Sequence, residues 1–234
     1  TRKESSAASD VYKRQMMHQS LLISNLIEHA AKYHADTSIF SCEVTGQMTT
    51  TNWLQVQQNS KRLANAFTSF NLNQGDRLAT IAWNNHRHLE SWYAISGSGY
   101  VCHTINPRLF PEQLVFIIND AQDKAIFFDS TFLPLIVAIQ GKVPTVEKFI
   151  CYGARDEKVI AALPDVIFYD DLIQNQSAEF NWPQFGEETP SSLCYTSGTT
   201  GNPKGVVYHH RGAYINAASN IIACGMMPRA TYLW

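Results

Sequence analysis

Apolar segments of strand length alternate with amphipathic segments of helix length through the middle of the chain. The strand-like segments are 77–83, 100–105, 125–128 and 148–152, and the helix-like segments between them are 88–98, 111–121 and 130–140. Strands that are apolar almost throughout, and that helices separate, are typical of a parallel sheet covered on both faces. We therefore predict an α/β fold with a mostly parallel sheet and flanking helices.

The flanking regions carry weaker patterns. Apolar residues recur at helical spacing over 20–33 and 51–70, and residues 39–44 are a short strand candidate. Residues 170–188 are polar, so we predict a loop there and a plausible domain boundary. Residues 1–15 are polar and without period, and methionines follow at once, so we expect a foreign or disordered leader outside the fold.

Composition excludes several classes of partner. The 234 residues carry a formal net charge of −2 and no Lys/Arg cluster longer than a pair, so we expect no nucleic acid partner. No apolar run approaches the ~18 residues that an integral membrane segment needs. Five dispersed cysteines without a CxxC pair predict buried free thiols and a cytoplasmic location. They are Cys42, Cys102, Cys151, Cys194 and Cys224.

The segment with the clearest chemistry is 196–205, which reads TSGTTGNPKG. It holds four hydroxyl side chains, three glycines and one lysine. Glycines let the backbone turn tightly, and the N–H groups of such a turn form a concavity that binds anions. Hydroxyls donate to phosphate oxygens or coordinate Mg²⁺, and the lysine adds a compact positive charge. The composition therefore predicts a phosphate-binding loop.

The surroundings of this loop distinguish it from the Walker-type phosphate loop. A Walker loop carries Ser or Thr directly after its lysine and opens into a helix. Here Gly205 follows Lys204, and the next residues, 206–208, read as a strand. We therefore predict strand, glycine loop, strand, and then a helix over 212–223. The alternative is a solvent-exposed hairpin that binds no ligand.

Three stretches resemble one enzyme superfamily. Residues 195–205, YTSGTTGNPKG, resemble the phosphate-binding signature of the adenylate-forming superfamily, which includes acyl-CoA synthetases, luciferase-like enzymes and adenylation domains of peptide synthetases. Residues 81–90, IAWNNHRHLE, and 103–111, HTINPRLFP, are similar to bacterial medium- and long-chain fatty-acyl-CoA synthetases. The resemblance extends from about Leu21 to Trp234.

The resemblance implies a two-step reaction with ATP, Mg²⁺ and coenzyme A. A carboxylate attacks the α-phosphate of ATP to give acyl-AMP and pyrophosphate, and coenzyme A then displaces AMP. The resemblance assigns the β- and γ-phosphates to seven residues: Thr196, Ser197, Gly198, Thr199, Thr200, Gly201 and Lys204. Lys204 is the candidate catalytic residue among them, and Thr196 is the candidate Mg²⁺ contact.

The resemblance also implies where this chain lies in such an enzyme. Residues 16–234 are expected to form part of the N-terminal AMP-binding domain, because the family's adenine and ribose motifs, acidic metal ligand and C-terminal lysine come further along. We expect the chain alone to be inactive. The expected substrate is a fatty acid, and a short thioether-bearing or aromatic acid is an alternative. A non-catalytic nucleotide-binding fragment is the alternative of a different class, and a homodimer is left open.

Other polar and aromatic side chains are assigned structural roles. We expect His86, His88 and His103 to be packing or surface residues, and Trp83 and Trp92 to belong to the core rather than to an acyl pocket. His209 and His210 follow the loop, and a structural role is favoured over a role in framing it. The pairs Asp170–Asp171 and Glu187–Glu188 are expected in solvated turns, and the sequence leaves Arg87 and Arg108 undecided between loop contacts and solvent.

Overall fold

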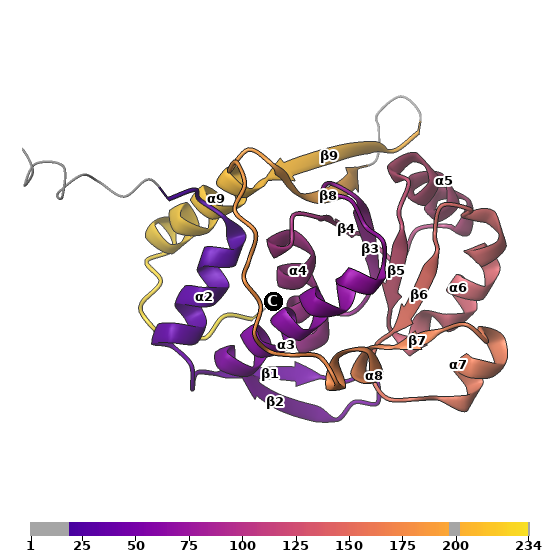
Figure 1. Ribbon diagram of the computed structural model, residues 1–234, viewed down its shortest axis with the longest axis horizontal. Helices are drawn as coiled ribbons and strands as arrows, with labels where there is room; N and C mark the ends of the chain where they lie inside the picture. The colour runs from indigo at the N-terminus through magenta and orange to yellow at the C-terminus, as the bar shows by residue number, and fades with distance from the viewer. Residues whose placement is uncertain (1–18, 197–201, 234) are drawn as a thin grey trace, which may run out of the picture.

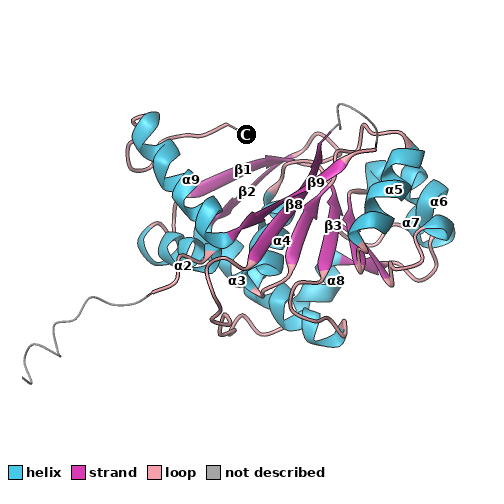
Figure 2. Ribbon diagram, turned by 90° about the horizontal axis from the view of Figure 1, so that it is seen from above, coloured by secondary structure: helices cyan, strands magenta, loops and turns pink. Residues whose placement is uncertain are grey.

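A seven-stranded sheet forms the centre of the computed structural model, which describes residues 19–196 and 202–233 (Figure 2). Its strand order is β7-β6-β5-β3-β4-β8-β9, and every neighbouring pair is parallel except β8 and β9. The strands are β3 Arg77–Ile81, β4 Val101–Thr104, β5 Ala125–Phe128, β6 Lys148–Cys151, β7 Ile167–Phe168, β8 Pro190–Thr196 and β9 Lys204–His209. The predicted α/β fold with a mostly parallel sheet is confirmed.

Helices cover both faces of this sheet. One face packs against α5 (Pro111–Ala121), α6 (Leu133–Ile139) and α7 (Glu157–Ala162). The other face packs against α3 (Trp53–Ala66), α4 (His86–Gly97) and α8 (Tyr169–Gln174). Because successive strand residues point to opposite faces, Leu78 enters the second core and its neighbour Ala79 enters the first. Burial on both faces explains why these strands are apolar almost throughout.

Two further helices and a two-stranded hairpin lie beside the sheet (Figure 1). Helix α2 (Ile23–Tyr33) and helix α9 (His210–Ala223) lie side by side, and an antiparallel hairpin of β1 (Ser38–Cys42) and β2 (Met48–Asn52) lies near the start of α3. Among the helices of the described part of the chain, none combines the length and the hydropathy that a membrane crossing requires.

The structure corrects the prediction for residues 170–188. They are not loop throughout, because α8 occupies Tyr169–Gln174. Asp170 and Asp171 lie in its first turn, where acidic side chains are favourable at a helix N-terminus. Asp170 contacts Arg87, and Asp171 contacts Arg155, so both aspartates are paired rather than free in a solvated turn. Glu187 and Glu188 do lie in a turn, as expected, but both are paired with Arg211, and Glu187 also accepts from Leu21 N.

Two other predictions are wrong, and a third concerns residues that the structure does not describe. The indole of Trp83 is not in the core, since 43% of the residue is exposed. Cys42 and Cys224 are exposed, whereas Cys102 and Cys151 are buried free thiols as predicted. The expected leader, residues 1–15, falls outside the described residues.

Candidate functional site

The glycine-rich motif lies between the two strands of an antiparallel hairpin. Residues of β8 and β9 pair in register, and the last pair before the loop is Thr196 opposite Lys204. Both residues are exposed. The predicted strands before and after the motif and the helix that follows are confirmed, as β8, β9 and α9 (His210–Ala223). Of the predicted phosphate contacts, Ser197, Gly198, Thr199, Thr200 and Gly201 lie outside the described residues.

Neighbouring elements hold the end of the hairpin that is remote from the loop. Ser191 Oγ donates to the carbonyl of Tyr208 across the hairpin at 3.0 Å. Ser96 Oγ, at the end of α4, donates to the carbonyl of Ser191 at 2.9 Å. On its other side β8 pairs with β4, so β8 lies inside the sheet and β9 forms the edge at this end of it. The sheet and α4 therefore hold in place the hairpin whose strands flank the motif.

The two histidines after β9 stabilise helix α9 and its contact with α2. His209 Nδ1 accepts from Gly212 N at 2.8 Å and caps the helix. His210 Nδ1 accepts from Ile23 N at 3.1 Å, and burial lowers the pKa of His210 to about 4. Both contacts are at the end of β9 opposite Lys204. The favoured structural role is confirmed for this pair.

Tyr195, which precedes Thr196, has a contact that the sequence did not reveal. Its hydroxyl donates to Asp120 Oδ2 at 2.6 Å, near the C-terminal end of α5. Figures 1 and 2 both place the ends of β8 and β9 that flank the loop beside α5. Burial and the bond to Asp120 together raise the pKa of Tyr195 above its ordinary value, so the phenol stays protonated and donates.

A buried pair lies under the Tyr195 ring. His103 Nδ1 is 2.7 Å from Asp123 Oδ2, and neither side chain is exposed. The His103 ring is 5.2 Å from the Tyr195 ring between centroids. Burial raises the pKa of Asp123, and the nearby His103 opposes that rise. His103 is thus a buried packing residue, as predicted, although sequence reasoning missed its aspartate partner.

Thr196 and Lys204 supply suitable chemistry for a phosphate ligand and its cation. Lys204 forms no ion pair with any described residue. Thr196 ends in a hydroxyl oxygen, the hard donor type that suits Mg²⁺. The described residues hold no group of three or more His, Cys, Asp or Glu side chains placed to bind a metal.

A cavity of about 550 Å³ lies where strands β3 and β4 end. Its wall includes Trp83, Asn84, Asn106 and Arg108. In open α/β sheets, ligands commonly bind outside the carboxyl ends of the strands. That rule could have pointed to residues 82–84 and 106–108 from the sequence. Arg108, undecided before, is therefore a cavity residue.

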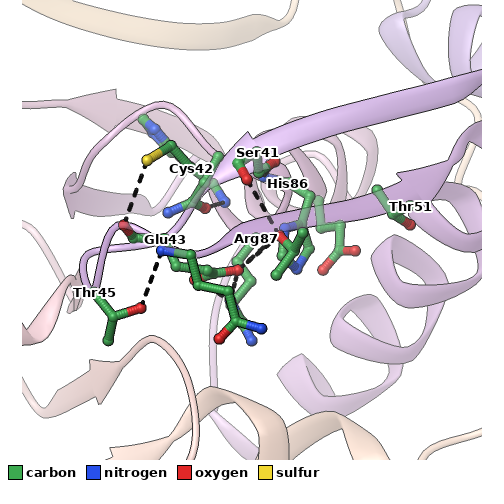
Figure 3. Close-up of polar contacts among 12 residues, drawn as sticks. Ser41, Cys42, Glu43, Thr45, Thr51, His86 and Arg87 are labelled. Atoms are coloured by element: carbon green, nitrogen blue, oxygen red, sulfur yellow. Dashed lines mark hydrogen bonds and ion pairs between the residues drawn. The ribbon is translucent and has the colours of Figure 1, made fainter.

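A polar cluster around Arg87 shares Glu43 with the wall of this cavity, and Figure 3 shows its contacts. Arg87 lies 3.0 Å from Glu43 and 3.2 Å from Asp170. Burial opposes the charge on Arg87, but the two carboxylates outweigh it and raise its pKa. Burial, and then Arg87, lower the pKa of His86. His86 N also donates to Ser41 Oγ at 3.0 Å (Figure 3). These contacts connect α4 to the β1–β2 hairpin and to α8. The cluster therefore has a structural role.

Comparison with known proteins agrees with this architecture. A 3-methylmercaptopropionyl-CoA ligase of Ruegeria lacuscaerulensis is 55% identical over 207 residues, which are 88% of this chain and 38% of the relative. A medium-chain-fatty-acid–CoA ligase of Ectopseudomonas oleovorans is 48% identical over 203 residues, 87% of this chain and 37% of the relative. This chain therefore spans less than two-fifths of the length of these curated relatives.

A solved structure and a family profile also match this chain. The crystal structure of a long-chain-fatty-acid-CoA ligase from Archaeoglobus fulgidus superposes with a TM-score of 0.75 at 20% identity, over 91% of this chain and 41% of that one. At that identity the likeness shows the fold. The profile of the AMP-binding enzyme family matches residues 27–234. The chain therefore belongs to the AMP-binding enzyme family.

Proposed function

We propose that the protein is an AMP-forming acyl-CoA ligase and that residues 16–234 form part of its N-terminal domain. In the first step a carboxylate oxygen bonds to the α-phosphorus of ATP, and the bond to pyrophosphate breaks. In the second step the thiol sulfur of coenzyme A bonds to the acyl carbon, AMP leaves, and the thiol gives up its proton. The curated relatives named above are CoA ligases, which supports this reaction.

The proposal depends on the end of the β8–β9 hairpin that flanks the glycine-rich motif. We call the register pair Thr196 and Lys204 the neck of the hairpin. Thr196 and Lys204 are register partners there, so a hydroxyl and an ammonium group flank the glycine-rich residues between them. A carboxylate is a weak nucleophile, and catalysis must come mainly from holding the phosphates and stabilising the charge that builds on pyrophosphate. Lys204 supplies a positive charge at the first position of β9 for this purpose. We also propose that Thr196 contacts the Mg²⁺ ion, which would neutralise further phosphate charge.

The names of the relatives support two kinds of acid. The sequence resemblance favours a fatty acid, and the 48% identical relative is named for medium-chain fatty acids. The 55% identical relative is named for 3-methylmercaptopropionyl-CoA, whose acid is short and carries a thioether. We propose a small carboxylic acid, with medium-chain fatty acids and 3-methylmercaptopropionate as the two candidates.

The test is a substrate series with the full-length protein. Octanoate, palmitate, 3-methylmercaptopropionate and benzoate are each incubated with MgATP, with and without coenzyme A. Acyl-AMP, pyrophosphate and acyl-CoA are then quantified. Acyl-AMP without coenzyme A and acyl-CoA with it would support the ligase. Nucleotide binding without acyl-AMP from any acid would instead favour the non-catalytic alternative.

A further inference from the structure

The aromatic ring of Tyr195 fits against a glycine on the opposite strand. Tyr195 and Gly205 are register partners, one pair further from the loop than Thr196 and Lys204. A Cβ atom at residue 205 would lie 3.3 Å from Tyr195 Cζ and 3.1 Å from Leu193 Cδ1. Both distances are tighter than ordinary contacts, so a larger residue at 205 would push the ring aside. Gly205 therefore provides the space that the Tyr195 ring fills.

The partner of the Tyr195 hydroxyl is itself fixed. Asp120 is the penultimate residue of α5, and the end of that helix is tied to β3 by Arg77. The Arg77 guanidinium donates to the carbonyl of Ala121 and, at 3.3 Å, to Gln122 Oε1. Asp120 thus offers an acceptor in a defined position. The Tyr195 side chain consequently has contacts at its hydroxyl, with Asp120, and at its ring, with Gly205 and His103.

We infer that Tyr195, held by Asp120, is a positioning residue for Thr196 and Lys204, the two residues that flank the glycine-rich motif. This inference rests on the proposed ligase function. Tyr195 is covalently bonded to Thr196 and lies across the strands from the residue next to Lys204. Fixing Tyr195 therefore fixes Thr196 and Lys204, the two residues proposed to contact the pyrophosphate part of ATP and its Mg²⁺ ion. A charge-stabilising site depends on such preorganisation, because its groups must already be in place when charge develops.

The test removes each partner of the Tyr195–Asp120 hydrogen bond in the full-length protein. Tyr195→Phe keeps the ring over Gly205 and removes the hydroxyl, and Asp120→Ala removes the acceptor. A net hydrogen-bond contribution of this kind corresponds to a rate change of about three- to tenfold. We expect each variant to lower the kcat of acyl-AMP formation by that factor, with the KM for the carboxylic acid unchanged. The thioester half-reaction from preformed acyl-AMP should also be unchanged.

Three comparisons separate positioning from a structural role. Asp120→Asn keeps an acceptor oxygen and should stay within about twofold of the parent rate. The double variant Tyr195→Phe with Asp120→Ala should be no slower than either single variant, because both remove the same interaction. Tyr208→Phe is the matched control on β9, since its exposed hydroxyl has no hydrogen bond with a described side chain.

Hydrogen exchange supplies a readout that does not depend on activity. Tyr195→Phe should speed amide exchange in β8 and β9 next to the loop, and leave β3 and β5 unchanged. An unchanged rate of acyl-AMP formation, an equal loss in both half-reactions, or an equal loss in Tyr208→Phe would each overturn the inference. A parent protein that forms no acyl-AMP at all would instead overturn the proposed function, and this inference with it.

Discussion

Lys204 differs from the other cations of the chain in its position. It is the first residue of a strand that begins where the glycine-rich motif ends, and it forms no ion pair with a described residue. Arg87, in contrast, is bound by two carboxylates that fix it within the fold. The motif made Lys204 identifiable from the sequence. Asp120 and Asp123 were not identifiable, because their role depends on contacts across 75 and 20 residues of chain.

We predict that Lys204→Ala slows acyl-AMP formation in the full-length protein much more than it affects the second step. Removing one group that stabilises transition-state charge typically lowers the rate by about 10²–10³-fold. The thioester step from preformed acyl-AMP should change little, because pyrophosphate has already left. Each half-reaction is measured separately by quenched flow, and Lys158→Ala, an exposed lysine on α7, is the control. An equal loss in both half-reactions would contradict the phosphate assignment.

Glu90 makes the stability of the protein depend on pH. Its carboxyl group is fully buried, accepts from Asn59 and Tyr169, and has a pKa that burial raises from 4.5 to about 7. The folded state therefore binds a proton more tightly than the unfolded state. The resulting stabilisation is complete below pH 4.5 and is lost as pH rises through about 7.

We predict that Glu90→Gln flattens this part of the stability profile. Glutamine preserves the shape and cannot ionise, so the free energy of unfolding should no longer fall between pH 4.5 and about 7. At neutral pH the shift corresponds to a gain on the order of 3 kcal/mol at most, since one pKa unit equals about 1.4 kcal/mol. Urea denaturation at several pH values measures it. The exposed Glu157→Gln is the control, and parallel profiles for Glu90→Gln and the parent would contradict the prediction.

The elements that could be predicted are those whose own residues dictate them. Strand β5 is buried at every position and its apolar run matches the structure from Ala125 to Phe128. Helix α5 begins with a proline in its first turn and was predicted at its observed bounds. Strand β2 was missed because it is polar, with the sequence MTTTN, and its pairing with β1 defines it. Helices α7 and α8 have six residues each, too few to show a helical period.

A side-chain cap fixes the start of helix α3 at Trp53. The sequence pattern predicted a start two residues earlier, at residue 51. Asn52 Oδ1 accepts from Gln55 N at 2.9 Å. We predict that Asn52→Ala lowers the free energy of unfolding by about 1 kcal/mol, because a backbone N–H loses its partner. Asn52→Ser, which can still cap, should stay near the parent, and urea denaturation compares them. Equal losses in the two variants would show that the cap is not the cause.

At the scale of the whole molecule, apolar exposure is concentrated at the side of β9 and α9. Val207 on β9 is 57% exposed, and Ile222 at the end of α9 is 81% exposed. The opposite end of the sheet, in contrast, has its strands covered by α7 and α8. Contiguous exposed apolar residues commonly mark a surface that contacts other protein. The hairpin that carries the glycine-rich motif lies on this less covered side, so the described residues that flank the motif are open to a ligand or to a further part of the protein.

We predict that the 234-residue chain by itself forms no acyl-CoA under conditions in which the full-length protein does. The curated relatives are more than twice as long as the part that this chain matches. The described residues offer a hairpin for phosphates, but they hold no cluster of three or more acidic, His or Cys side chains for a metal. Both proteins are incubated with MgATP, coenzyme A and the preferred acid, and acyl-CoA is quantified by mass spectrometry. Circular dichroism of the 234-residue chain first verifies that it is folded. Acyl-CoA formation by this folded chain would mean that its residues complete the active site, and the assignment of the hairpin as only one part of that site would be wrong.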